Sequence, residues 1–232
     1  MKQKKNLLVL SGAGMSAESG LKTFREMGGL WEQYDVTEVA TPEAFKRNPE
    51  LVLRFYNERR KQLLEVQPNT GHYGVADLEK SFNVQIITQN VDDLHERAGS
   101  TNIMHLHGEL RKARSTEVPS NVVDIDGWEL DLGDLCEYGS QLRPDIVWFG
   151  ESVPNIELAI PLVKKADVLV IIGTSMQVYP AASLMDYAPS GIPVFLIDPN
   201  ETAIGYDDKI TFLKMGAGEG VAKLKDMLLH YE

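Results

Sequence analysis

Five short, continuously apolar runs, separated by stretches with helical periodicity, constrain the fold of this chain more than any other feature. The runs cover residues 7–10, 84–88, 146–149, 168–172 and 194–197. They are continuous instead of alternating, as expected for parallel strands that helices cover on both faces. Helical periodicity occupies residues 157–165, 181–187 and 220–229. This alternation predicts an α/β fold with a doubly wound, Rossmann-like parallel sheet.

Two long segments interrupt this alternation and predict a smaller lobe beside the sheet. The first is mostly helical and contains an amphipathic helix over residues 49–64, whereas the second is rich in Asp and Glu and has little periodicity. We therefore expect a single unit over residues 1–232. Its large domain is expected to comprise residues 1–30, 80–108 and 143–232, and its small lobe the insertions 31–79 and 109–142.

Polar residues follow two of the apolar runs at the point where each predicted strand ends. Gln89, Asn90 and Asp92 come after the second run, and His107 follows a shorter run around Ile103. In an α/β sheet, ligands bind beyond the carboxyl ends of the strands. If the two strands are neighbours, these residues form a constellation that can orient a sugar and move a proton. If they are not, the residues are two unrelated polar turns.

A glycine loop follows the first apolar run directly and opens a helical stretch. Residues 12–17 match the G-x-G-x-x-A form, in which missing side chains let the backbone approach a pyrophosphate. The acidic residue expected about 20 positions later has no counterpart, so a standard dehydrogenase is disfavoured. The loop continues through Phe24 and Arg25, which form either a flap over a ligand or a surface loop with Phe24 in the core.

Net charge and cysteine content limit the classes of binding partner and the cellular compartment that we expect. The formal net charge of −11 argues against binding to nucleic acid or to anionic membranes, because both require basic patches. The charge permits a basic protein substrate, but solubility is the favoured explanation for it. Cys136 is the only cysteine, which rules out an internal disulfide and a Cys-x-x-Cys zinc site. The apolar run after the basic N-terminus is too short for a signal peptide, so we expect a cytoplasmic protein.

Taken in order along the chain, these segments resemble the sirtuin (Sir2) family of NAD-dependent protein-lysine deacylases. The resemblance extends from about residue 7 to residue 217. The motifs that carry it are Gly12-Ala13-Gly14-x-Ser16-x-x-Ser19-Gly20, Phe24-Arg25, Thr88-Gln89-Asn90-x-Asp92, His107-Gly108, Phe149-Gly150-Glu151 and Gly173-Thr174-Ser175.

The resemblance implies a role for each motif. It places NAD against a set of cofactor-binding residues: Gly12, Ala13, Gly14, Ser16, Ala17, Gly20, Thr23, Phe24, Arg25, Trp31, Gln89, Asn90, Asp92, Gly173, Thr174 and Ser175. It makes His107, Asn90 and Asp92 the catalytic residues, with His107 as general base. It assigns Phe149, Gly150, Glu151 and Val153 to the backbone of an acyl-lysine peptide, which would pair as an added strand.

The implied chemistry suits these residue types. A histidine with a pKa near neutrality can deprotonate a ribose hydroxyl, and the alkoxide then attacks the acyl carbon. The implied products are free lysine, nicotinamide and O-acyl-ADP-ribose. A lone histidine is usually a satisfied structural residue, and we interpret His72, His95 and His105 in that way.

The helix predicted over residues 49–64 carries a Tyr-x-x-Arg pattern. Tyr56 and Arg59 are three residues apart and so share a helix face, and an arginine fork beside a tyrosine hydroxyl suits a carboxylate. The pattern resembles the class III sirtuins, which remove succinyl and malonyl groups and bind the distal acid with Tyr-x-x-Arg. The competing interpretation is a solvated helix face within a charged run.

The chain departs from the family pattern in its small lobe. Most sirtuins have two cysteine pairs there, whereas this chain has Ser115, Leu135 and Cys136 in the corresponding stretch, so we predict no zinc. The lobe would instead be held by packing of apolar residues, for which the candidates are Val122, Ile125, Trp128, Leu130 and Leu132. Near the C-terminus, Asp198 stands where many relatives have Asn and could accept from an adenosine ribose hydroxyl. Ala217 is placed near the adenine by position.

Three alternatives remain at this point. The chain could be an NAD-dependent deacetylase without preference for acidic acyl groups, a protein ADP-ribosyltransferase, or an inactive NAD-binding module. The presence of both Asn90 and His107 argues against the last two.

Overall fold

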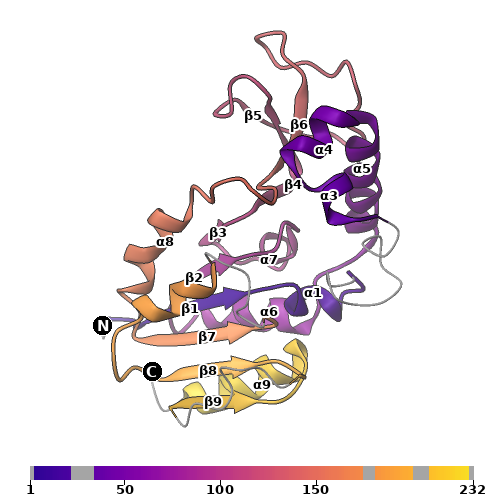
Figure 1. Ribbon diagram of the computed structural model, residues 1–232. Helices are drawn as coiled ribbons and strands as arrows, with labels where there is room; N and C mark the ends of the chain where they lie inside the picture. The colour runs from indigo at the N-terminus through magenta and orange to yellow at the C-terminus, as the bar shows by residue number, and fades with distance from the viewer. Residues whose placement is uncertain (1–2, 22–33, 175–180, 201–208, 230–232) are drawn as a thin grey trace.

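The computed structural model describes residues 3–21, 34–174, 181–200 and 209–229, and its centre is a six-stranded parallel sheet (Figure 1). The strand order is β3-β2-β1-β7-β8-β9, and each neighbouring pair is parallel. The bounds are β1 (Asn6–Ser11), β2 (Asn83–Thr88), β3 (Ile103–His105), β7 (Val168–Ile172), β8 (Val194–Ile197) and β9 (Ile210–Leu213). The order changes direction between β1 and β7, which is therefore the switch point of a doubly wound sheet.

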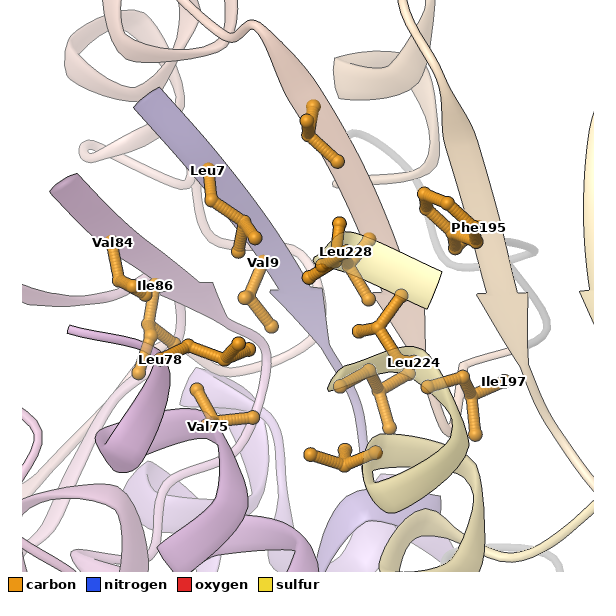
Figure 2. Close-up of a cluster of buried hydrophobic side chains, with 14 of the residues drawn as sticks. Leu7, Val9, Val75, Leu78, Val84, Ile86, Phe195, Ile197, Leu224 and Leu228 are labelled. Atoms are coloured by element: carbon orange, nitrogen blue, oxygen red, sulfur yellow. The ribbon is translucent and has the colours of Figure 1, made fainter. Parts of the chain in front are cut away.

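Helices cover both faces of this sheet. Helices α6 (Thr70–Leu78) and α9 (Ala217–Leu228) pack on one face, where Figure 2 shows their side chains against those of the strands. Helix α8 (Ile156–Val163) and the 3₁₀ helix η1 (Ala181–Tyr187) pack on the other face. Successive residues of β1 alternate between the two clusters. Because both faces are buried, the strands are apolar at nearly every position, which is the pattern that predicted them.

A small lobe rises from the sheet (Figure 1). It consists of α3 (Val36–Val39), α4 (Pro42–Arg47), α5 (Pro49–Glu65), β4 (Gly108–Ser115), β5 (Val122–Asp124) and β6 (Leu142–Ile146). The three strands form an antiparallel sheet in the order β5-β4-β6. Helix α5 begins at Asn48, whose side chain accepts from the Leu51 amide at 3.1 Å, and Pro49 occupies the first turn, where its missing N–H costs nothing.

The prediction of a parallel-sheet strand over residues 146–149 is wrong. Strand β6 ends at Ile146 and pairs antiparallel with β4 in the small lobe. Trp148 follows it in a loop and is only 2% exposed, because it packs into the small-lobe core beside α5. Ile146 and Trp148 are therefore apolar because they pack in the small-lobe core, and a continuous apolar run alone does not distinguish this case from a buried parallel strand.

The predicted lobe boundaries also need correction at two places. Helix α6 lies within the insertion 31–79 but packs on the parallel sheet through Val75 and Leu78. Strand β6 lies almost wholly within the segment assigned to the large domain but belongs to the small sheet. Several elements were not predicted individually, among them the edge strand β9, helix α7 (Leu94–Arg97) and the small-lobe strands β4 and β5. No helix in the described part of the chain is long and apolar enough to cross a membrane.

Candidate active site

The carboxyl ends of β1, β2, β3 and β7 meet at one edge of the sheet. Thr88 at the end of β2 lies opposite Ser11 of β1 and opposite His105 of β3. The two strands that precede the predicted polar residues are therefore neighbours, which is the condition for a joint site. We call the following set the catalytic edge: Gly12, Gly14, Ser16, Gln89, Asn90, Asp92, His107 and Thr174.

The glycine loop after β1 lies in direct backbone contact with the loop after β7. The Gly14 amide donates to the Gly173 carbonyl at 2.8 Å. A Cβ on Gly12 would lie 2.6 Å from the Cβ of Thr174, and a Cβ on Gly14 would lie 2.6 Å from the Cα of Gly173. Any side chain would therefore separate the two loops. The helix that follows, α1 (Gly14–Ala17), has only four residues.

Ser16 connects the glycine loop to the two catalytic candidates on the loop after β2. Its hydroxyl donates to Asp92 Oδ2 at 2.9 Å and accepts from Asn90 Nδ2 at 3.1 Å. His72 Nε2 lies 3.5 Å from the same oxygen, and its Nδ1 accepts from the Asn69 amide at 3.3 Å, so Nε2 carries the proton. Ser16 is 2% exposed, and its one donor and two acceptor sites fix the orientation of Asn90 and Asp92.

Asp92 and Gln89 are held by further contacts at this edge. Asp92 is 8% exposed, and burial raises its pKa, while the hydrogen bonds from Ser16 and from the Leu94 amide act in the opposite direction. Gln89 Nε2 donates to Thr174 Oγ1 at 3.1 Å. The loops after β2 and β7 are therefore joined by side chains as well as by glycine packing.

The contacts of His107 suit a general base. Its Nδ1 lies 3.1 Å from the Gln89 carbonyl, and because a carbonyl only accepts, Nδ1 carries the proton of the neutral ring. Nε2 is then the basic nitrogen, and no hydrogen-bond partner for it is found among the described residues. Burial lowers the pKa of His107, and the bond to the Gln89 carbonyl opposes that shift. Gly108 follows with φ +82°, and a Cβ there would overlap the Asp145 carbonyl.

His105 lies beneath this edge and contacts the backbone of Asn90. Its Nδ1 is 2.9 Å from the Asn90 carbonyl and its Nε2 is 2.8 Å from Glu96 Oε1. Both partners are acceptors, so the ring donates from both nitrogens. Burial lowers the pKa of His105, but the bonds to Glu96 and Asn90 outweigh it and the net shift is upward. The interpretation of His105 as structural is consistent with these contacts, which also fix the main chain of Asn90.

The Tyr-x-x-Arg residues lie on α5, which faces the catalytic edge from the small lobe. Tyr56 is 1% exposed, and its hydroxyl accepts from Trp148 Nε1 at 3.0 Å. Burial raises the pKa of Tyr56 to about 12. Arg59 is half-buried, and burial lowers its pKa while the nearby Tyr56 and Asp92 act to raise it. The helix therefore carries Arg59 into the electrostatic neighbourhood of both Tyr56 and Asp92.

The segment assigned to the peptide backbone is an irregular loop. The Glu151 carboxylate accepts from Arg143 Nη1 at 2.7 Å and from the Trp148 amide at 2.8 Å. Phe149 is 51% exposed, and its amide donates to the Ala40 carbonyl at 3.0 Å. The amide of Glu151 donates to the Trp148 carbonyl, so neither amide is available for an added strand. Gly150 has φ +90° and Val153 is half-buried. Nothing in these observations tests pairing with a peptide, which stays a prediction.

The residues assigned to the adenosine half are spread over the ends of β7 and β8 and the start of α9. Thr174 is 9% exposed and contacts Gln89. Asp198 Oδ1 accepts from the Asn200 amide at 2.8 Å, and Ala217 opens α9 at 4% exposure. Ala17 and Gly20 close the loop after β1, with Gly20 at φ +92°. The remaining assigned residues lie outside the described part of the chain: Thr23, Phe24, Arg25, Trp31 and Ser175.

The donor set of the small lobe does not fit a tetrahedral zinc site. Cys136 Sγ donates to Ser115 Oγ at 3.3 Å, and the described residues contain no cluster of three or more His, Cys, Asp or Glu that could hold a metal. Among the predicted core residues, Ile125 and Leu130 are buried, but Val122 and Leu132 are 43% and 46% exposed. The prediction that these two pack in the lobe core is therefore wrong.

A family model matches most of the region that carries these features. The Sir2 family model aligns with residues 12–180, from the glycine loop to beyond Thr174. The chain belongs to the Sir2 family.

Curated relatives and solved structures of Sir2 proteins cover almost the whole chain. A Bacteroides thetaiotaomicron protein named NAD-dependent protein deacylase is 57% identical over 230 residues, covering 97% of this chain and 98% of that protein. A Helicobacter pylori protein of the same name is 60% identical over 197 residues, covering 84% of this chain and 85% of that protein. A solved Sir2 homolog–NAD complex is 40% identical, with a TM-score of 0.88, covering 99% of this chain and 91% of that one. The fold is therefore the Rossmann-like fold of Sir2 proteins.

Several contacts in the candidate site were not predicted from the sequence. The contact of Ser16 with Asn90 and Asp92, the Glu96–His105 pair and the donation from Trp148 to Tyr56 all join residues distant along the chain. Only one of them had a local signal. The pair of aromatic residues Trp148 and Phe149 at the end of an aliphatic run is unusual for a central parallel strand, and it could have indicated that residues 146–149 pack elsewhere.

Proposed function

We propose that this NAD-dependent protein deacylase of the Sir2 family acts on lysines that carry short acidic acyl groups, succinyl or malonyl, as well as acetyl. The observation that carries the proposal is that Tyr56 and Arg59 lie three residues apart on α5, where Tyr56 and Asp92 both act to raise the pKa of Arg59. One guanidinium thus connects the helix of the small lobe to the catalytic edge. A carboxylate at the distal end of an acyl chain is the ligand that a partly desolvated arginine and a phenol recognise together.

The residues of the catalytic edge suit NAD. The loops after β1 and β7 meet at the switch point, where dinucleotides bind in folds of this class. Gly12 and Gly14 let the loop after β1 lie directly against the loop after β7, and Asn90 and Asp92 offer an amide and a carboxylate for ribose hydroxyls and the nicotinamide amide. When bound, NAD supplies the ribose carbon to which the acyl oxygen is transferred and the nicotinamide that leaves.

His107 supplies proton transfer in this proposal. Its Nδ1 proton is held by the Gln89 carbonyl, so Nε2 is the atom that takes a proton from a ribose hydroxyl. Deprotonation there would prepare the hydroxyl to attack the acyl carbon. With the uptake of one water, the overall products would be free lysine, nicotinamide and O-acyl-ADP-ribose. Because the lowered pKa of His107 keeps the ring neutral at physiological pH, the base is ready before the substrate binds.

A panel of peptides bearing acetyl-, malonyl-, succinyl- or glutaryl-lysine, incubated with NAD and followed by mass spectrometry, tests the proposal. We expect Arg59→Met to lower kcat/KM for the succinyl peptide by about a hundredfold, the equivalent of a charge-assisted hydrogen bond. Deacetylation should change by less than about threefold, because an acetyl group has no distal acid. Equal losses on both peptides would contradict an acid-binding role.

Arg54→Met provides a matched control on the same helix. Arg54 is exposed and removing it changes the net charge by the same amount. If it lowers desuccinylation as much as Arg59→Met does, the effect is a general one of charge on a lysine peptide and the specific site is excluded.

A further inference from the structure

The hydroxyl of Tyr56 accepts a hydrogen bond from Trp148, which lies in the loop after β6. We call this loop, residues 147–153, the peptide-facing loop, because the family resemblance assigns it to the substrate peptide. An indole N–H can only donate, so the 3.0 Å contact between Trp148 Nε1 and Tyr56 Oη makes the phenol oxygen the acceptor. The hydroxyl's own proton must then point elsewhere. Among the described residues, no acceptor for that proton is found. Tyr56 is also neighbour to Arg59, whose positive charge acts on it.

We propose that Trp148 is a specificity-determining positioning residue: its N–H occupies the oxygen of Tyr56 and leaves the hydroxyl proton for the distal carboxylate of a succinyl or malonyl group. This inference rests on the proposed preference for acidic acyl groups and assigns a third residue to it. Trp148 does not itself touch the acyl chain. It decides which way the Tyr56 hydroxyl faces, so that Tyr56 donates to the carboxylate while Arg59 supplies the charge.

The surroundings of Trp148 hold its ring in a single orientation. The Arg143 guanidinium carbon lies 3.3 Å from the ring centroid on one face, and the Phe45 ring centroid lies 5.4 Å away. Arg143 is fixed in turn by two hydrogen bonds to the Glu151 carboxylate, at 2.7 and 3.1 Å. With 2% of its surface exposed, Trp148 has little freedom to rotate its N–H away from Tyr56.

A chain of contacts therefore leads from the peptide-facing loop to the acyl-binding helix. Glu151 belongs to the loop assigned to the substrate peptide, and Tyr56 to the helix assigned to the acyl group. A hydrogen bond between two neutral groups strengthens when its acceptor also donates to an anion. Occupation of the Tyr56 oxygen by Trp148 thus makes Tyr56 a better donor to a carboxylate, and it has no consequence for an acetyl group.

Trp148→Phe tests the proposal because phenylalanine keeps an aromatic ring over Arg143 and removes only the donor. We expect kcat/KM for a succinyl-lysine peptide to fall about fivefold to tenfold, the value of one net hydrogen bond, and kcat/KM for the matching acetyl peptide to stay within about twofold. In a Tyr56→Phe background, which has no hydroxyl to orient, Trp148→Phe should produce no further change in the succinyl-to-acetyl ratio. An unchanged ratio in Trp148→Phe, or an equal effect in both backgrounds, overturns the proposal.

Two further variants separate orientation from packing. Phe45→Leu reduces packing against the tryptophan ring while Arg143 still lies over its face. The hydrogen bond to Tyr56 should therefore remain, and the ratio should be unchanged. If Trp148→Phe does not fold, β-(3-benzothienyl)alanine introduced at position 148 keeps the shape of the indole and replaces its N–H with sulfur; the same drop in the ratio is expected. Should Arg59→Met spare desuccinylation while the wild type performs it, the acid-binding function itself fails. If Arg59→Met is selective but Trp148→Phe is not, only the role of Trp148 fails.

Discussion

The parallel sheet and the outer part of the small lobe are stabilised in different ways. In the sheet, β1 and β7 are nearly or completely buried at every apolar position, and two large apolar clusters cover the faces. The small lobe has a comparable cluster between α5 and Trp148. Its outer cluster, around Ile125 and Leu130, is small, and single polar side chains complete it. Asn57 exchanges two hydrogen bonds with the backbone of Leu130, at 3.0 and 3.2 Å, as a neighbouring strand would.

This difference determines what each region tolerates. The catalytic edge lies on a rigid scaffold, so a substitution there should change chemistry and leave the fold intact. The small lobe depends on a few buried polar contacts, among them Arg60, whose guanidinium donates to Asn57 and to the Leu110 and Trp128 carbonyls. A substitution there should change stability first, because a lost partner leaves buried groups without hydrogen bonds.

The largest effect is expected for His107→Ala at the catalytic edge. Removing a general base costs about 10²–10⁴-fold in rate, so deacylation in the mass-spectrometric assay should fall by at least that factor. Binding of NAD, measured by calorimetry, and the melting temperature should change little, because the His107 side chain is half-buried and makes one hydrogen bond to the described part of the chain. A variant that still deacylates at more than a tenth of the wild-type rate would rule out His107 as the base.

A smaller effect, and on stability instead of rate, is expected for Asn57→Ala in the small lobe. The change removes both bonds to Leu130 and the acceptor at 2.9 Å from Arg60 Nη1, which should lower the free energy of unfolding by about 3 kcal/mol. Urea unfolding followed by far-UV circular dichroism measures it.

Asn121→Ala is the matched control in the same lobe. Its side chain bonds the exposed Glu137, so the cost should be at most about 0.5 kcal/mol. Comparable losses in the two variants would mean that the polar contacts of the lobe interior have no special weight.

The same contrast explains what sequence reasoning reached. Continuous apolar runs reveal strands covered on both faces, and the carboxyl ends of parallel strands gather the residues that follow them. The convergence of Asn90, Asp92 and His107 therefore followed from pattern and topology together. The small lobe offered no such rule, because Asn57 and Leu130 are 73 residues apart and an isolated asparagine looks the same on a surface as in a core. Residues 146–149 were misassigned for the related reason that Trp148 packs on a helix.

A third effect concerns the pH dependence of the reaction. His107 must be neutral to accept a proton, and burial lowers its pKa from the ordinary value of 6.5. The neutral form therefore persists to lower pH, and the acid limb of kcat/KM should have its midpoint below 6.5. Rates measured from pH 5 to 8, with stability checked at each pH, locate the limb. A midpoint at or above 6.5 would assign it to another group.

The smallest effects are expected at Cys136 in the small lobe, where the resemblance to sirtuins would place zinc-binding cysteines. Cys136 contributes one weak thiol hydrogen bond to Ser115, which a hydroxyl can replace, so Cys136→Ser should shift the melting temperature by no more than about 4 °C. A strong zinc chelator should shift it even less. A small lobe stabilised by zinc would lose far more stability on chelation, because a structural zinc contributes on the order of 10 kcal/mol to the fold that it holds. Stoichiometric zinc in the purified protein, with unfolding of the small lobe when it is chelated, would contradict a lobe held by Asn57, Arg60 and a small apolar core.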